Sequence, residues 1–342
     1  MDNSILLDVV NLKKHFPIRT GVLKKITGHV KAVDDVSFQV FEGETLGLVG
    51  ESGCGKTTTG RMILNLINPT DGTINFNSNI IKTKNKTTIN ILELSSTDLK
   101  KVRQEMQIIF QDPYSSLNPR MTVGSLISEP LVTHKIIQNK RDLKKRILEV
   151  LNSVGLSDSH INRFPHEFSG GQRQRIGIAR AIALSPKLIV ADEPVSALDV
   201  SIQAQVINLL KSIQNELNIS FLFIAHDLSV IKYISDRIAV MYLGKIVELC
   251  TKDELFNNPK HPYTEALISS IPIPNPKHKK NKIILEGDVP SPSNPPTGCH
   301  FHTRCKYAKN ICRESIPFLK NINNKNDHYV SCHLSQELKL NY

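Results

Sequence analysis

Eight consecutive residues near the N-terminus have the types and spacing of a phosphate-binding loop. The loop lies between a short apolar run at 44–49 and a helical pattern at 56–67. Its glycines let successive backbone N–H groups converge on an anion, and the helix start adds the positive end of its dipole. A plain polar turn would explain the Gly and Ser residues but not the flanking strand and helix. The residues of this phosphate loop are Gly50, Glu51, Ser52, Gly53, Cys54, Gly55, Lys56 and Thr57.

Two positions of this loop are expected to do the electrostatic work of binding a nucleotide. Lys56 would neutralise the β- and γ-phosphates of ATP, and the Thr57 hydroxyl would ligate Mg²⁺, with Thr58 beside it in the first helical turn.

Acidic residues follow a second apolar run, and they predict catalysis. The run 188–191 ends in Asp192 and Glu193. Since the carboxyl ends of parallel strands meet at one edge of a sheet, these acids are expected beside the phosphate loop. Asp192 would hold Mg²⁺, and Glu193 would polarise the attacking water. His226, after the apolar run 221–225, would donate a hydrogen bond to the γ-phosphate.

A second loop rich in backbone N–H donors precedes the helical pattern at 173–184. Its residues open a helix as the first loop does, so it offers a second anion site. One γ-phosphate does not need two cradles from one subunit. We therefore expect this loop to face the nucleotide of a partner subunit, so that two chains enclose two ATP molecules. This second loop consists of Ser169, Gly170, Gly171 and Gln172.

Strand and helix patterns alternate along most of the chain. Strands are predicted at 5–11, 34–41, 73–77, 106–110 and 220–225, helices at 142–154 and 201–217, and loops at 77–90 and 115–119. This alternation is typical of an α/β fold with a mostly parallel sheet wrapped by helices. An insertion rich in Gly and Lys occupies 17–31. Phe16, just before it, would either stack on adenine or fill the core.

Size and charge exclude some classes of protein. With 342 residues, 40% of them hydrophobic, the chain has room for a large globular domain and an appendage. It contains no apolar stretch of membrane-spanning length, and its start lacks the pattern of a signal peptide, so it is expected to stay where it is made. The net charge of +11 comes from clusters without interleaved aromatic residues, which favours solvated faces or anionic lipid over nucleic acid.

The order of these motifs looks like the nucleotide-binding subunit of ABC transporters, over about residues 5–255. The resemblance implies an ABC-type P-loop domain at 1–258, with a RecA-like parallel core, an antiparallel β subdomain and a helical subdomain at about 112–172. It also implies head-to-tail dimerisation driven by ATP, with hydrolysis at the interface. Phe168 stands where Leu is usual. The matching residues are the phosphate loop, Gln111 as a sensor of Mg²⁺ and of the membrane subunit, the second loop, Asp192 and Glu193, the 196–199 segment ending in Asp199, and His226.

Further segments resemble the ATPase subunits of oligopeptide and dipeptide importers, at 47–56, 110–120, 163–169 and 285–299. The insertion after Phe16 is similar to the F-type subunit, which implies a D-type paralogue as heterodimer partner. The resemblance also implies two transmembrane permeases, an extracytoplasmic solute-binding protein and a peripheral place on the cytoplasmic face of the membrane. Peptide chemistry follows from the resemblance alone. Nickel or glutathione as cargo, or a soluble ABC-type ATPase acting on nucleic acid, are the alternatives.

The C-terminal part, 259–342, combines a Pro-rich linker or loosely packed extension with a cluster of cysteines. Nine of the 18 prolines lie between 259 and 298. Four thiols within 34 residues favour a metal site over disulfides. Their spacing lacks the zinc knuckle, and the resemblance implies a 4Fe-4S cluster; zinc and unliganded thiols stay open. The four are Cys299, Cys305, Cys312 and Cys332, whereas Cys54 and Cys250 are expected to lack ligand neighbours.

Overall fold

The computed structural model describes residues 4–22, 24–81, 87–272, 282–323 and 327–340. Contacts between residues divide the chain into two compact units. The first comprises Met1–Leu7, Val40–Thr45 and Asn75–Ile224, and the second comprises Asp8–Gln39, Leu46–Ile74 and Ala225–Tyr342. The second unit therefore holds both the phosphate loop and the C-terminal part, while the domain boundary at 258 stays a prediction.

Parallel strands form the centre of the first unit. They are β6 (Met106–Ile109), β7 (Leu188–Asp192) and β8 (Ser220–Ala225), and β7 pairs with the other two. All residues of β7 and β8 are buried. Their near-continuous apolar sequences suit strands that are covered on both faces. In the same unit, β5 (Thr88–Asn90) pairs antiparallel with the end of β4 (Asp71–Asn77).

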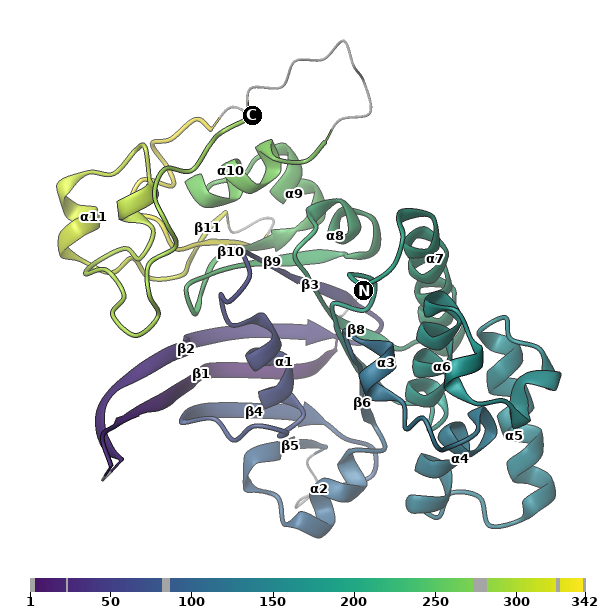
Figure 1. The fold of residues 1–342 in the computed structure, drawn as a ribbon. Helices are drawn as coiled ribbons and strands as arrows, with labels where there is room; N and C mark the ends of the chain where they lie inside the picture. The colour runs from purple at the N-terminus through teal and green to yellow at the C-terminus, as the bar shows by residue number, and fades with distance from the viewer. Residues whose placement is uncertain (1–3, 23, 82–86, 273–281, 324–326, 341–342) are drawn as a thin grey trace. The chain divides into compact units, whose positions relative to one another are not determined.

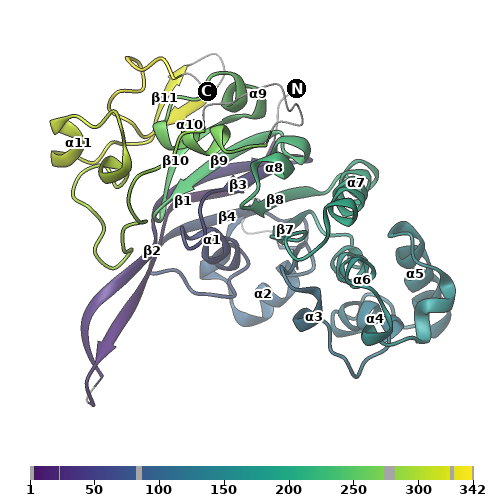
Figure 2. The same ribbon diagram turned by 45° about the horizontal axis from the view of Figure 1, so that its top comes forward.

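Helices of the first unit pack side by side, α4 on α5, both on α6, and α6 on α7 (Figures 1 and 2). The loop predicted at 115–119 is wrong in part, because a short helix begins at Pro113. Asp112 caps it by accepting N–H hydrogen bonds from Tyr114 and Ser115, and proline suits the first helical position. The helices are α2 (Ser96–Val102), α3 (Pro113–Ser116), α4 (Val123–Thr133), α5 (Lys140–Ser153), α6 (Gly170–Ile182) and α7 (Val200–Leu217), with 3-10 turns at Ile91–Glu93, Asp158–Asn162 and Pro165–Glu167.

Two long strands dominate the N-terminal part of the second unit. The strands predicted at 5–11 and 34–41 are the ends of β1 (Ile5–Thr20) and β2 (Lys25–Phe41). The two lie next to each other and project as a hairpin, seen in purple in Figure 2. The insertion predicted at 17–31 thus supplies the outer part of this hairpin, apart from residue 23, which lies outside the described residues. On its other side, β1 neighbours β4.

The rest of the second unit joins parallel and antiparallel strands. β3 (Thr45–Val49) runs parallel to β9 (Arg237–Tyr242), which pairs antiparallel with β10 (Lys245–Thr251). β12 (His328–Val330) then pairs with β10, and β11 (Lys320–Asn323) with β12, so the C-terminal part extends this sheet by two antiparallel strands. The helices are α1 (Lys56–Ile63), α8 (Leu228–Ile234), α9 (Lys252–Asn257), α10 (Pro262–Ser269) and α11 (Asn310–Glu314), with a 3-10 turn at His302–Arg304.

Two predictions need correction in this unit, the end of one helix and the packing of one segment. α1 ends at Ile63 instead of 67, and Asn65 already has a positive φ of 47°. The loosely packed extension predicted from 259 is wrong for α10, because its Tyr263 and Ile268 side chains are buried at 0% and 2% exposure.

A buried polar contact fastens the C-terminal strands to β10. His328 Nε2 lies 2.7 Å from Glu248 Oε1, and both side chains are buried. Glu248 also accepts the N–H groups of Lys260 and His261, at 2.7 and 3.0 Å, which ties down the approach to α10. The ligand atoms of Cys250, Glu248 and His328 lie within 4.8 Å of one another, so the expectation that Cys250 lacks such neighbours is wrong.

Candidate nucleotide site

The phosphate loop closes around its own lysine. The Lys56 ammonium, 4% exposed, donates to the carbonyl oxygens of Gly50 and Glu51, at 2.7 and 3.0 Å. The Glu51 N–H group donates to the Tyr263 hydroxyl at 2.9 Å. Two carbonyl dipoles thus hold the cation inside the loop, where phosphate oxygens would offer full negative charge.

Gly55 shows why the loop needs glycine where it turns into α1. Its φ is +107°, and a Cβ there would lie 2.2 Å from the Ala32 carbonyl oxygen and 2.7 Å from Met241 Cε. No side chain fits that space. As the N-cap residue of α1, Gly55 directs the first helical N–H groups, and with them Thr57 and Thr58, toward the loop. Ser52 and Gly53 are exposed at its tip.

β7 delivers the predicted acids in the first unit. Asp192, its last residue, is 2% exposed, and Glu193 follows with a left-handed φ of 46°. The Glu193 N–H donates to the Ile224 carbonyl at 3.0 Å, and its own carbonyl accepts from Ser196 N–H at 3.2 Å. A non-glycine residue in this conformation costs about 1–2 kcal/mol, and such strain concentrates at functional sites.

Gln111 reaches the same acid. Its Nε2 donates to Glu193 Oε2 at 3.2 Å from the segment that follows β6. Two residues that are 82 positions apart in the sequence are thereby brought into contact, as expected for neighbouring parallel strands.

The second loop forms the N-terminus of α6. Ser169 Oγ accepts the Gln172 N–H at 3.4 Å while the Ser169 N–H donates to Gln172 Oε1 at 3.1 Å, which is a capping box. α6 therefore begins at Gly170 and not at 173 as predicted. A Cβ on Gly171 would lie 2.5 Å from Ile202 Cγ2, so glycine allows α6 to approach α7. Ser169 and Gly170 remain exposed, as does Asp199, the N-cap residue of α7.

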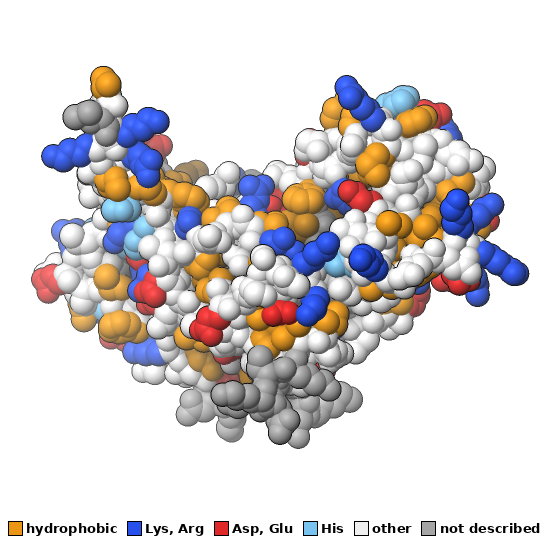
Figure 3. Space-filling view, turned by 90° about the horizontal axis from the view of Figure 1, so that it is seen from below, with side chains coloured by type: hydrophobic (Ala, Val, Ile, Leu, Met, Phe, Trp, Pro, Cys, Tyr) orange, Lys and Arg blue, Asp and Glu red, His pale blue; other side chains and the backbone are white. Residues whose placement is uncertain are grey.

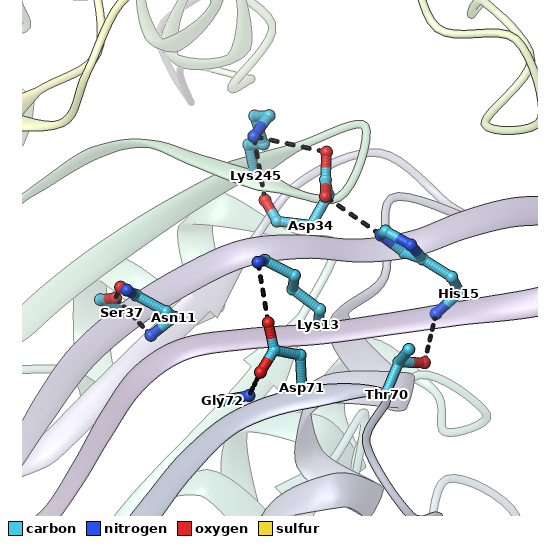
Figure 4. A network of polar contacts seen from close by, with 9 residues as sticks. All are labelled: Asn11, Lys13, His15, Asp34, Ser37, Thr70, Asp71, Gly72 and Lys245. Atoms are coloured by element: carbon cyan, nitrogen blue, oxygen red, sulfur yellow. Dashed lines mark hydrogen bonds and ion pairs between the residues drawn. The ribbon is translucent and has the colours of Figure 1, made fainter.

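Phe16 lies on β1 in the second unit and is 37% exposed, so it is not a core side chain. The Lys14 ammonium lies 5.0 Å from its ring centroid. Next to it, His15 Nε2 contacts Asp34 Oδ1 at 3.0 Å, and Lys245 Nζ lies 3.5 Å from Asp34 Oδ2 (Figure 4). Burial acts to raise the pKa of Asp34, but Lys245 and His15 outweigh it and hold that pKa below its usual value.

His226, also in the second unit, is exposed between β8 and α8. The following residue, Asp227, caps α8 by accepting the Ser229 N–H at 2.7 Å. The histidine thus stands at a strand end, as the sequence predicted.

All of the clustered cysteines line one small cavity. Its wall contains Cys299, Cys305, Cys312 and Cys332, together with His261, Phe301 and Tyr307. The pKa values of Cys299, Cys305 and Cys332 are raised to about 11 each, mainly by burial and to a smaller extent by the neighbouring cysteines. The fold therefore gathers thiols that are spread over 34 residues of sequence.

Sequence reasoning missed two residues of the C-terminal part that contact the phosphate loop. Besides Tyr263, Arg304 donates from Nη1 and Nη2 to the two carboxylate oxygens of Glu51, at 2.7 and 3.1 Å. The pair is separated by 253 positions, so no local spacing could have indicated it.

None of the helices in the described part of the chain combines the length and apolar composition needed to span a membrane.

Comparisons with known proteins place the chain among transport ATPases. The family pattern described as ABC transporter matches residues 33–196, and the one described as oligopeptide/dipeptide transporter, C-terminal region, matches 247–312. The oligopeptide transport ATP-binding protein AppF of Bacillus subtilis is 54% identical over 96% of this chain and 97% of its own length. OppF of Salmonella typhimurium is 51% identical over 96% of each. A dimeric post-hydrolysis structure of the ATP-binding cassette MJ0796, bound to ADP and Pi, superimposes with a TM-score of 0.61 at 28% identity, covering 72% of this chain and 99% of that one.

Proposed function

This chain belongs to the ABC transporter family, and on that premise we propose that it is the subunit that hydrolyses ATP to drive oligopeptide import. The family and the fold make it an ATPase. Two relatives named as oligopeptide transport ATP-binding proteins, each about half identical over nearly the whole chain, support the cargo. The match at 247–312 adds support, because that family pattern is described as the C-terminal region of oligopeptide/dipeptide transporters.

Lys56 and the loop amides bind and neutralise the β- and γ-phosphates, and Thr57, Asp192 and Gln111 would hold Mg²⁺. Bound Mg²⁺ would offset charge that develops on the phosphate oxygens. The Thr57 hydroxyl, the Asp192 carboxylate and the Gln111 amide offer the hard oxygen donors that Mg²⁺ prefers.

Glu193 acts as the general base that polarises the attacking water. The Gln111 contact supports this role, since the amide group holds one oxygen of the Glu193 carboxylate in a defined position. His226 would donate to the γ-phosphate as hydrolysis proceeds. The strained backbone at Glu193 supports the assignment independently.

The active form is proposed to be a head-to-tail dimer in which Ser169 and Gly170 meet the ATP of the partner. Their exposure at the N-terminus of α6 supports this, because an exposed helix N-terminus is suited to an anion. The relative MJ0796 has been solved as a dimer. The partner would be a D-type paralogue.

We place the dimer on the cytoplasmic face of the membrane, bound to two permeases that receive peptide from a solute-binding protein. The segment after Gln111 would pass movement to the permeases. On the face in Figure 3, Lys and Arg side chains are interspersed with acidic and apolar ones, which supports contact with protein or lipid over a nucleic-acid groove.

Uptake into proteoliposomes tests the cargo. The chain is assembled with the paralogue and both permeases, and ATP-dependent accumulation of a labelled oligopeptide is measured with the binding protein present. We expect uptake that excess nickel or glutathione does not reduce. Uptake of nickel or glutathione without peptide uptake would contradict the proposal, and so would retention of the chain by nucleic acid instead of by membranes.

We further propose that the cysteine cavity holds a 4Fe-4S cluster. The donor set fits: four thiols line one cavity beside Phe301 and Tyr307. A tetrahedral zinc ion with Zn–S bonds of about 2.3 Å would bring its sulfurs within about 3.8 Å of one another. Among the described residues, just one group of three or more His, Cys, Asp or Glu residues has ligand atoms that all lie within 4.8 Å of one another, and it contains none of these four cysteines. A larger cluster suits such wider spacing.

Metal analysis of the anaerobically purified protein tests the cluster. About four iron and four sulfide per chain are expected. One zinc per chain, or no metal with four titratable thiols, would overturn the assignment.

A further inference from the structure

The contact between Arg304 and Glu51 joins the C-terminal cysteine segment to the phosphate loop. It is bidentate, with both guanidinium nitrogens within 3.1 Å of a carboxylate oxygen. The Arg304 side chain is 8% exposed and that of Glu51 27%, so the pair is largely shielded from water. Parallel hydrogen bonds of this kind are among the strongest that side chains form, and they fix orientation as well as distance.

Aromatic side chains hold Arg304 in place. Its guanidinium lies 6.0 Å from the ring centroid of Tyr242. Tyr242, Tyr263 and Phe301 form a cluster with ring centroids 4.7 to 5.4 Å apart, and each is at most 2% exposed. Tyr263 reaches from this cluster to the Glu51 N–H at 2.9 Å. One rigid group of side chains thus grips Glu51 at both its backbone and its carboxylate.

Glu51 is an unfavourable neighbour for a nucleotide. It lies in the loop that must receive a triphosphate, and like charges repel strongly where water is scarce. Its carboxylate, left alone, would oppose ATP binding. Arg304 neutralises that charge and turns it into an attachment point.

We propose that Arg304 is a positioning residue for nucleotide binding: through Glu51 it holds the phosphate loop in shape and cancels the negative charge within it. The C-terminal segment then contributes to the nucleotide site and also carries the four cysteines that line the cavity. The inference depends on ATP binding and is independent of the transported ligand, of the dimer and of the occupant of the cysteine cavity.

Affinity for ATP measures this role. The purified full-length chain and its Arg304→Met variant are titrated with a fluorescent ATP analogue, which is then displaced by ATP. Removing the guanidinium should weaken binding about tenfold, the usual effect of losing a hydrogen bond to a charged group. In the assembled transporter, KM for ATP should rise to a similar extent while kcat stays within about twofold, because Arg304 does not touch the reacting atoms.

A second substitution separates positioning from general damage. Adding Glu51→Gln to Arg304→Met removes the unpaired charge, so the double variant should recover about threefold of the lost affinity. General damage to the fold would make the double variant weaker than the single one. Lys309→Met is the matched control, because it removes a cation of the same segment whose partner, Glu337, is exposed.

Arg304→Lys covers the case in which the methionine variant does not fold. It keeps a charge but loses the planar fork, so an affinity loss of about threefold is expected. Wild-type affinity in the variants that lack the guanidinium, or no recovery on adding Glu51→Gln, would overturn the proposal.

Discussion

The phosphate loop and the cysteine segment lie in the same unit, yet they differ in how their chemistry is encoded. The loop concentrates its donors in consecutive residues, 50–57, which fold on themselves around Lys56. The cysteine segment gathers four thiols from 299–332 into one cavity, and its strand β12 pairs with β10. A site made of consecutive residues can therefore be predicted from the sequence, whereas a site made of residues far apart in the sequence is found only when the fold is known. Arg304 and Glu51 connect the two.

The largest effect is expected at the catalytic acid. Glu193→Gln should keep ATP binding but lower hydrolysis by at least roughly a hundredfold, since a positioned base contributes 10²–10⁴. Turnover of ATP by the assembled transporter is the measurement. Glu216→Gln, on the exposed side of α7, is the matched control and should hydrolyse ATP at the normal rate. Normal turnover in Glu193→Gln would refute the role.

The next largest effect is expected at Gly55, where it tests whether close packing under the phosphate loop matters for ATP binding. Gly55→Ala would place a Cβ 2.2 Å from the Ala32 carbonyl at a positive φ, so ATP affinity should fall at least about tenfold. Gly53 also has a positive φ, but a Cβ there would lie in open space. Gly53→Ala should therefore weaken ATP binding by only about 1 kcal/mol. Equal losses in the two variants would show that close packing under the loop does not matter.

A smaller effect would show that the two regions are not independent. Cys305→Ser removes a cavity thiol next to Arg304 in the sequence. Because the substitution should disturb the position of Arg304, ATP affinity should fall about threefold, which is within the usual range for coupled networks. Cys250→Ser, also buried in the second unit, lies outside the cavity lining and should leave affinity unchanged. Identical ATP affinities of the two serine variants would show that the cysteine cavity does not influence ATP binding at the phosphate loop.

The smallest effect concerns pH and the strands beside the loop. Asp34 contacts His15 and Lys245, so Asp34→Asn should lower the free energy of unfolding by about 0.5 kcal/mol at pH 7. Because the folded pKa of Asp34 lies below its unfolded value, this contribution is present above the unfolded pKa and is lost as the pH falls through the folded one. Urea unfolding at pH 7 and at about pH 3 should show the difference between wild type and variant shrinking. A constant difference would contradict the assignment.

Sequence reasoning predicted correctly that several of the candidate residues follow strands or open helices. Buried strands such as β7 have apolar runs, and the residues at their ends, Asp192 and Glu193, could be predicted from that position alone. It could not find the left-handed backbone at Glu193 or the hydrogen bonds from Arg304 to Glu51, because both depend on contacts between distant segments.

The predictions that were wrong also have physical explanations. The composition of 259–298 resembles a linker, but α10 is buried there because Tyr263 and Ile268 pack inward. Prolines predict where helices begin as well as where they end, and Pro113 and Pro262 each start one.

The structure of the assembled Glu193→Gln transporter with MgATP bound tests the central claim most directly, namely that ATP is hydrolysed between two subunits. The account predicts that Ser169 Oγ and the Gly170 N–H lie within hydrogen-bond distance of the γ-phosphate held by the phosphate loop of the partner subunit. A structure in which both point away from every bound triphosphate would contradict it.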